Sequence, residues 1–175
     1  MNRRMVKCDH VEYLNDEMRG LPIGRQCMNL NLGCADAHLA GFVNVDQRTP
    51  ADQLADLSEP WPWDDSSVDF IRAVDVIEHL PDKVRTMNEA WRVLIPGGRL
   101  EILVPTTDGP GAWQDPTHVS FWNENSFLYY TDQDPHRERG GQWTGIKARF
   151  RVLKKELTID PWKVVKLYIL LEAVK

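Results

Sequence analysis

Acidic side chains and one glycine stand just past the ends of several short apolar segments. Gly33 follows the segment that ends at Leu32, and Asp46 closes a second segment 13 residues after that glycine. A glycine lets the backbone approach a ligand closely, and a carboxylate past a second strand can accept hydrogen bonds from both hydroxyls of a ribose. The spacing therefore predicts a small-molecule site at these segment ends.

Two further segments end in the same way. Asp56 beside Leu57 joins a carboxylate to an apolar side chain, which could face the amino group and ring of a purine. Val74-Asp75 ends the next segment, and Glu78-His79 follows one turn later. Strand-end acids also cap helices and turns, so the order of these residues along the chain carries the prediction, not any one of them.

The candidate for proton transfer is His118, in the long segment after the last central strand. Its imidazole could remove a proton near neutral pH, and Asp115 could orient it. The alternative is structural: Asp115 caps a turn at Pro116, and His118 packs against Phe121. Aromatic residues crowd the same segment and could form a pocket or, as we favour, the core that lets a long loop fold.

The elements that must position these residues alternate between strands and crossovers. Apolar periodicity predicts one clear helix from Pro81-Asp82 to Leu94, ended by Pro96-Gly97-Gly98, and a short helix at residues 10–20. Strands are predicted at 26–32, 42–46, 53–57, 68–74 and 99–105, with an antiparallel pair at the sheet edge at 147–158 and 163–174. Such alternation predicts an α/β protein with a mostly parallel sheet, whose ligands bind outside the carboxyl ends of the strands.

Length and composition narrow the classes further. The chain has 175 residues, enough for one domain, and a formal net charge of −5, which argues against a nucleic-acid partner. No apolar stretch approaches the roughly 20 residues of a membrane span. The three cysteines, Cys8, Cys27 and Cys34, show no C-x-x-C spacing, and the five histidines show no paired metal motif. We therefore expect a cytoplasmic protein without a metal site.

Six sequence blocks, in order and spacing, resemble the small class I S-adenosylmethionine-dependent methyltransferases of the type 11 kind. They are Met28–Ala35, Gly41–Asp46, Ala55–Leu57 with Pro60–Trp63, Ser67–Ile71, Val76–Leu80 and Trp91–Leu100. The resemblance implies a Rossmann-like fold: a mostly parallel seven-stranded sheet with an antiparallel final pair, in a three-layer sandwich. It implies a single domain over 1–175, with a cofactor half at 28–105, a substrate-side insertion at 106–146 and the final strand pair at 147–175.

The resemblance also implies roles for individual residues, with S-adenosylmethionine as the cofactor. Asp46 would hold the ribose hydroxyls, and Asp56 and Leu57 would contact the adenine. Leu32, Gly33 and Cys34 would form the loop that passes under the methionine and ribose portion. Val74, Asp75 and His79 would form the wall near the methionine end. The acceptor is expected to be a small molecule or a glycan or lipid precursor, methylated on oxygen or nitrogen, and a homodimer is allowed.

Two departures keep alternatives open. In the usual Gly-x-Gly loop the second glycine is replaced here by Ala35. The stretch from Gly33 to Asp46 is also short for a crossover with a full helix. The first helix is therefore expected to be a turn or two, or absent. A catalytically silent binding module with the same fold remains an alternative. A nicotinamide-dependent oxidoreductase is a weaker one, since it needs G-x-G-x-x-G where this chain has Gly33-Cys-Ala-Asp-Ala-His38.

Overall fold

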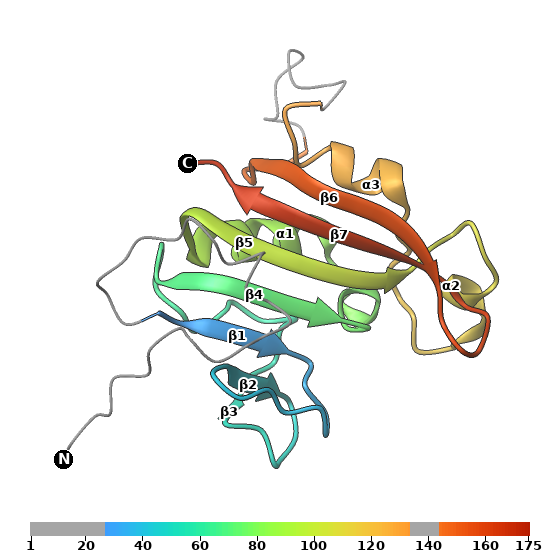
Figure 1. Cartoon of the computed structure of the whole chain (residues 1–175). Coiled ribbons are helices and arrows are strands. Elements are labelled where there is room, and N and C mark those ends of the chain that lie inside the picture. The colour runs from blue at the N-terminus through green and yellow to red at the C-terminus, as the bar shows by residue number, and fades with distance from the viewer. Residues whose placement is uncertain (1–26, 134–143) are drawn as a thin grey trace.

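The computed structural model describes residues 27–133 and 144–175, and the helix expected at 10–20 lies outside them. Seven strands form one sheet in the order β3-β2-β1-β4-β5-β7-β6 (Figure 1). The strands are β1 Asn29–Leu32, β2 Val43–Asp46, β3 Gln53–Leu54, β4 Val68–Val74, β5 Leu94–Pro105, β6 Phe150–Ile159 and β7 Val165–Ala173.

The sheet is parallel from β3 to β5 and antiparallel at its other edge. β1 lies between β2 and β4 in parallel register, and β4 pairs in parallel with β5. β7 runs antiparallel to both β5 and β6, so β6 is the edge strand. This arrangement confirms the expected Rossmann-like α/β fold with its antiparallel final pair. It also brings the carboxyl ends of β1, β2 and β4 together at one edge, where a ligand can bind.

The helices are few and short: η1 Ile77–His79, α1 Lys83–Val93, α2 Gly111–Gln114 and α3 Glu124–Leu128. α1 begins at Asp82, whose carboxylate accepts a hydrogen bond from the Arg85 amide. α3 begins at Asn123 with a capping box completed by Ser126. No helix within the described residues is both long and apolar enough to cross a membrane.

The start of β5 differs from the prediction. α1 ends at Val93, within one residue of the predicted Leu94, but β5 begins at Leu94 and not at Arg99, so Pro96-Gly97-Gly98 does not form a loop between them. Leu94 already pairs with Val68, and an irregularity in register follows before Arg99 pairs with Phe70. The Pro-Gly-Gly segment therefore lies inside an irregular strand, where positive φ at Gly97 is accommodated.

The two faces of the sheet differ in what covers them. One face, with α1 and α3, carries the main core, which includes Met87 of α1 and Phe127 of α3. The other has a small cluster of Phe70 and Leu170 covered by Phe42 and Leu39 from the connection between β1 and β2. Residues 33–42 form turns with no helix, as their short length predicted.

Candidate active site

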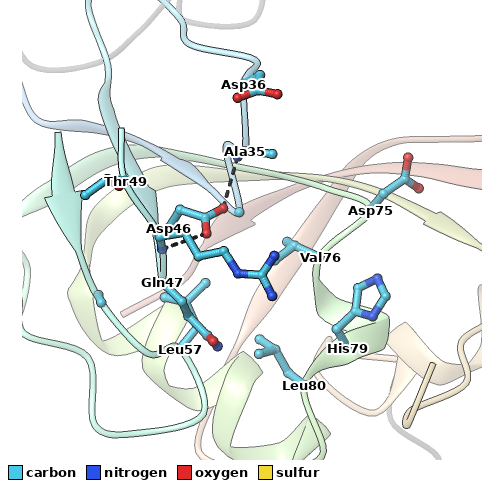
Figure 2. Close-up of a pocket in the computed structure, with 13 residues that line it drawn as sticks. Ala35, Asp36, Asp46, Gln47, Thr49, Leu57, Asp75, Val76, His79 and Leu80 are labelled. Atoms are coloured by element: carbon cyan, nitrogen blue, oxygen red, sulfur yellow. Dashed lines mark hydrogen bonds between the residues drawn. The ribbon is translucent and has the colours of Figure 1, made fainter. Parts of the chain in front are cut away.

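A cavity of about 540 Å³ opens at the carboxyl ends of β1, β2 and β4 (Figure 2). This volume is in the range of small-molecule pockets. Its lining comes from the loop after β1, the residues after β2 and β3, and the turn from β4 into η1. The lining residues are Gly33, Ala35, Asp36, Asp46, Gln47, Arg48, Thr49, Ala55, Leu57, Asp75, Val76, His79 and Leu80.

Asp46 is fixed in place by two backbone amides. The Ala35 amide donates to Oδ2 at 3.0 Å, and the Arg48 amide donates to Oδ1 at 3.1 Å (Figure 2). Each carboxylate oxygen has two acceptor positions, so both oxygens can accept a further hydrogen bond from a ligand. Asp46 is thus a pre-oriented acceptor pair at the edge of the cavity.

Gly33 allows the loop after β1 to turn and also to pack closely against Val76. Gly33 has φ +60°, and a Cβ placed on it would lie 2.5 Å from Cγ2 of Val76. The Val76 side chain therefore occupies the space that any larger residue at position 33 would need. This contact ties the loop after β1 to the turn after β4, the two segments that form opposite parts of the cavity lining.

Five of the nine predicted cofactor residues line the cavity: Gly33, Asp46, Leu57, Asp75 and His79. The others do not appear in its lining. Leu32 and Cys34 are buried, each 2% exposed, and burial raises the pKa of the Cys34 thiol. Val74 is the last residue of β4.

Asp56 is engaged in its own turn. Its Oδ1 accepts hydrogen bonds from the amide and the hydroxyl of Ser58, and these bonds lower the pKa of the carboxyl. β3 ends at Leu54, before this turn, which is three residues earlier than the predicted end at Leu57. Leu57, which is 6% exposed, is the member of this pair that faces the cavity.

The sequence prediction missed several lining residues. Gln47, Arg48 and Thr49 directly follow β2, so the strand-end rule that selected Asp46 could have included them. Val76 and Leu80 offered no signal of their own, because apolar residues in a turn look like core.

The charged groups in the lining are mostly acidic. The lining holds three carboxylates, Asp36, Asp46 and Asp75, and one guanidinium, Arg48; because Lys166 offsets the charge of Asp75, a small excess of negative charge is left, which favours a ligand with positive charge. Figure 2 shows the Asp75 carboxylate turned away from His79. It pairs instead with the ammonium of Lys166 at 2.6 Å.

Beside the cavity, two imidazoles meet edge to face with ring centroids 5.0 Å apart: His79 of η1 and His118 of the 106–146 segment. Nδ1 of His79 lies 3.1 Å from the carbonyl oxygen of Thr117, and Nδ1 of His118 lies 3.0 Å from that of Ala112. A carbonyl oxygen only accepts hydrogen bonds, so Nδ1 carries the proton in both rings. Their Nε2 atoms are left to accept a proton or bind a cation.

The predicted pairing of Asp115 with His118 is loose. Oδ2 of Asp115 lies 3.7 Å from Nε2 of His118, beyond hydrogen-bond distance. Oδ1 of Asp115 accepts from the amide and hydroxyl of Thr117, so this residue caps the turn at Pro116, as the structural alternative predicted. The Ala112 carbonyl orients His118 instead, and a catalytic role for either residue remains a prediction.

Glu78 belongs to η1, directly before His79. It is 2% exposed, and neither carboxylate oxygen has a hydrogen-bond partner among the described residues. Burial raises the pKa of its carboxyl to about 7, and the charge of Asp75 adds to that rise. A buried carboxylate without partners is unusual and needs a reason.

Three of the six aromatic residues that the structure describes in the 106–146 segment belong to the core. Trp122 and Phe127 are at most 1% exposed and stack at 5.0 Å, and Tyr130 is 4% exposed. Trp113 differs: it is 58% exposed and stacks on Phe121 at 4.3 Å. The three buried residues agree with the prediction that the aromatics chiefly let the segment fold, whereas Trp113 and Tyr129 do not belong to this core.

Comparison with known proteins points to one family. Residues 24–102 match the model of a family described as methyltransferase domain. A stretch of 71 residues is 36% identical to 27-O-demethylrifamycin SV methyltransferase of Amycolatopsis mediterranei (strain S699). That alignment covers 38% of this chain and 25% of the relative, so the chain spans only a quarter of that protein.

Solved structures share the fold at low sequence identity. An S-adenosylmethionine-dependent methyltransferase from Methanosarcina mazei has a TM-score of 0.59 and 13% identity, over 84% of this chain and 92% of that one. The 1,6-didemethyltoxoflavin-N1-methyltransferase of Burkholderia thailandensis, bound to 1,6-didemethyltoxoflavin and S-adenosylhomocysteine, has a TM-score of 0.58 and 14% identity. The match covers 87% of this chain and 73% of that one.

Proposed function

We propose that this chain belongs to the class I S-adenosylmethionine-dependent methyltransferases, as the family match over residues 24–102 and the shared fold indicate, and that it transfers a methyl group from S-adenosylmethionine to an acceptor. The acceptor we propose is a small molecule or a glycan or lipid precursor, with oxygen or nitrogen as the nucleophile. The observation that carries the proposal is Asp46, held by two backbone amides at the edge of a cavity at the carboxyl ends of the strands.

The residues present fit this cofactor. Asp46 has free acceptor positions on both oxygens for the two ribose hydroxyls. Ala55, Leu57 and Leu80 offer apolar surface to a purine ring. The excess of carboxylates over guanidinium in the lining complements the positive sulfonium and amino groups. S-adenosylmethionine supplies a methyl group activated by the sulfonium.

The protein's part in such a transfer is chiefly alignment. Asp46 and the loop after β1 hold one end of the cavity rigid, because Gly33 and Val76 interlock. His79 lines the cavity on the side of the 106–146 segment, where we place the acceptor. Fixing donor and acceptor in one geometry removes most of the entropy that a bimolecular reaction must lose.

The silent binding module is the second candidate, and Ala35 is the observation that bears on it. Ala35 has φ 41°, the left-handed conformation that a glycine would adopt at this position. The loop therefore keeps the backbone path of a Gly-x-Gly loop and still directs the Ala35 amide to Asp46. This favours a working cofactor site over a silent one.

Calorimetry with the purified chain tests the proposal. We expect S-adenosylmethionine and S-adenosylhomocysteine to bind at one equivalent, and NAD not to bind. Binding of NAD alone would favour an oxidoreductase, and binding of none of the three would favour a module without this cofactor. Incubation with S-adenosylmethionine carrying a labelled methyl group, with pooled hydroxyl- and amine-bearing acceptors, then separates an enzyme from a binding module.

A further inference from the structure

We propose that Glu78, His79 and His118 form a binding site for a divalent first-row transition metal at the rim of the cavity. Each of the three residues offers one ligand atom, and these atoms all lie within 4.8 Å of one another. Two imidazoles and one carboxylate form a donor set that binds zinc, iron, manganese or cobalt in proteins.

The hydrogen bonds of the two rings suit metal binding. A histidine that binds a metal through one nitrogen commonly donates the other N–H to a carbonyl or carboxylate, which fixes its tautomer and orientation. Both rings have this arrangement already, with Nδ1–H donated to the carbonyls of Thr117 and Ala112. Their Nε2 atoms are thus the free ligands.

Glu78 supplies the independent observation. It is 2% exposed, and both of its carboxylate oxygens lack a partner among the described residues. Burying a carboxylate without partners is costly, and a bound cation would satisfy it. The cluster therefore holds a buried carboxyl group to which no other side chain of the described residues donates a hydrogen bond.

Backbone contacts hold the three side chains together across a long stretch of sequence. The amides of Val119 and Ser120 both donate to the carbonyl of Glu78 at 2.9 Å. The Ser120 hydroxyl donates to the carbonyl of Ile77, also at 2.9 Å. These bonds fix the segment carrying His118 against η1, so the fold itself holds the backbone of the three residues in place.

Some side-chain movement must accompany binding. Metal–nitrogen distances of about 2.1 Å place the ligand atoms of one metal roughly 3.5 Å apart. The three ligand atoms would therefore close by at most about 1.5 Å, within the reach of side-chain rotation. His79 also lines the cavity, so the metal would lie where an acceptor oxygen could bind it; this last role rests on the proposed methyl transfer, whereas metal binding itself does not.

The test uses the full chain without a histidine tag, stripped with a chelator. Titration with zinc, cobalt or manganese chloride, followed by calorimetry and elemental analysis, measures affinity and stoichiometry. We expect about one equivalent of at least one of these metals, a higher melting temperature in its presence, and, for cobalt, a visible absorption band from nitrogen and oxygen ligands.

Two variants and a matched control decide the result. Glu78→Gln and His118→Ala should each weaken metal binding at least about 10-fold, whereas His38→Ala, at an exposed histidine outside the cluster, should leave it unchanged. Glu78→Gln should fold at least as well as the parent chain without metal, because it removes a buried unpaired carboxylate, yet it should lose the metal-induced rise in melting temperature.

The proposal is overturned if no metal binds stoichiometrically. It is also overturned if Glu78→Gln and His118→Ala both bind the metal as tightly as the parent chain does. S-adenosylhomocysteine binding, measured in chelator, separates this outcome from failure of the proposed methyl transfer. Loss of cofactor binding in the parent chain would contradict the methyltransferase and leave the metal site standing.

Discussion

The amide of Ala35 donates a hydrogen bond to Oδ2 of Asp46 across 3.0 Å, and Ala35 makes this bond with a left-handed backbone at φ 41°. A residue with a Cβ adopts this conformation at a penalty of about 1–2 kcal/mol. The loop after β1 therefore stores strain at the position where it orients the carboxylate. Two predictions follow from this pair of residues, one for each partner.

Asp46→Ala should weaken binding of S-adenosylhomocysteine by about 5- to 150-fold, because hydrogen bonds to a charged group are worth roughly 1–3 kcal/mol. Calorimetry on folded protein measures the change. Asp64→Ala is the matched control, since Asp64 is exposed in the turn before β4 and outside the cavity lining. Equal affinities in both variants would mean that Asp46 does not hold the ribose.

Ala35→Gly should raise the free energy of unfolding by roughly 1 kcal/mol, because relief of the left-handed strain exceeds the extra flexibility of glycine in the unfolded chain. Ala37→Gly is the comparison: Ala37 lies in the same exposed loop without a positive φ, so glycine there should be neutral or destabilising. Denaturant unfolding of both variants measures the difference. A lower free energy of unfolding for Ala35→Gly than for the parent chain would contradict the proposed backbone strain at Ala35.

Gly33→Ala should destabilise the chain by roughly 2–3 kcal/mol, because the new Cβ would lie 2.5 Å from Cγ2 of Val76 and the backbone there has φ +60°. Adding Val76→Ala should recover only part of the steric penalty, because it removes Cγ2 but keeps the Cβ of residue 76, which lies 2.8 Å from the new Cβ. A double-mutant cycle measures this coupling. Additive effects would show that the loop and the turn after β4 are not interlocked.

Glu89→Gln should destabilise the chain by about 2 kcal/mol at neutral pH. Glu89 accepts two hydrogen bonds from Arg92 at 2.8 Å and one from the Trp61 amide, and these bonds hold the pKa of its carboxyl below the ordinary 4.5. A lowered pKa in the folded state means that the carboxylate stabilises the fold above about pH 4.5, and that this contribution is lost as the pH falls through the folded-state pKa.

The difference between parent and Glu89→Gln should therefore stay constant from pH 7 to about 4.5 and shrink in more acidic solution. Chemical unfolding at a series of pH values measures it. Glu59→Gln, at an exposed glutamate, is the control that reports the general effect of losing one negative charge. If the difference in free energy of unfolding between the parent and Glu89→Gln grows as the pH falls, the pKa of Glu89 is not lowered in the folded chain.

Local patterns determined much of the fold. Val68–Val74 is a strand with the predicted bounds, because a run of mostly apolar residues between turn signals favours a buried strand. Asp82 begins α1 where the sequence predicts it, since its side chain satisfies a free amide. The start of β5 was misplaced by five residues, because a Pro-Gly-Gly signal does not tell a loop from an irregular strand.

Strand order brought the strand-end residues to one edge, so Gly33, Asp46, Leu57, Asp75 and His79 could be found from the sequence alone. Asp56 could not be told from a ligand-binding acid, because a carboxylate that closes its own turn with Ser58 has the same sequence signal.

Residue types and spacing along the chain determined the α/β class, the sheet edge at which the cavity opens and the presence of Asp46 in its lining, because periodicity and strand ends are local properties. Only the tertiary structure decided which distant groups meet. Glu78 and His118 are 40 residues apart, and they converge because the amides of Val119 and Ser120 bind the Glu78 carbonyl. No local rule contains such a long-range hydrogen bond, so the Glu78–His79–His118 cluster emerges only when the chain is folded.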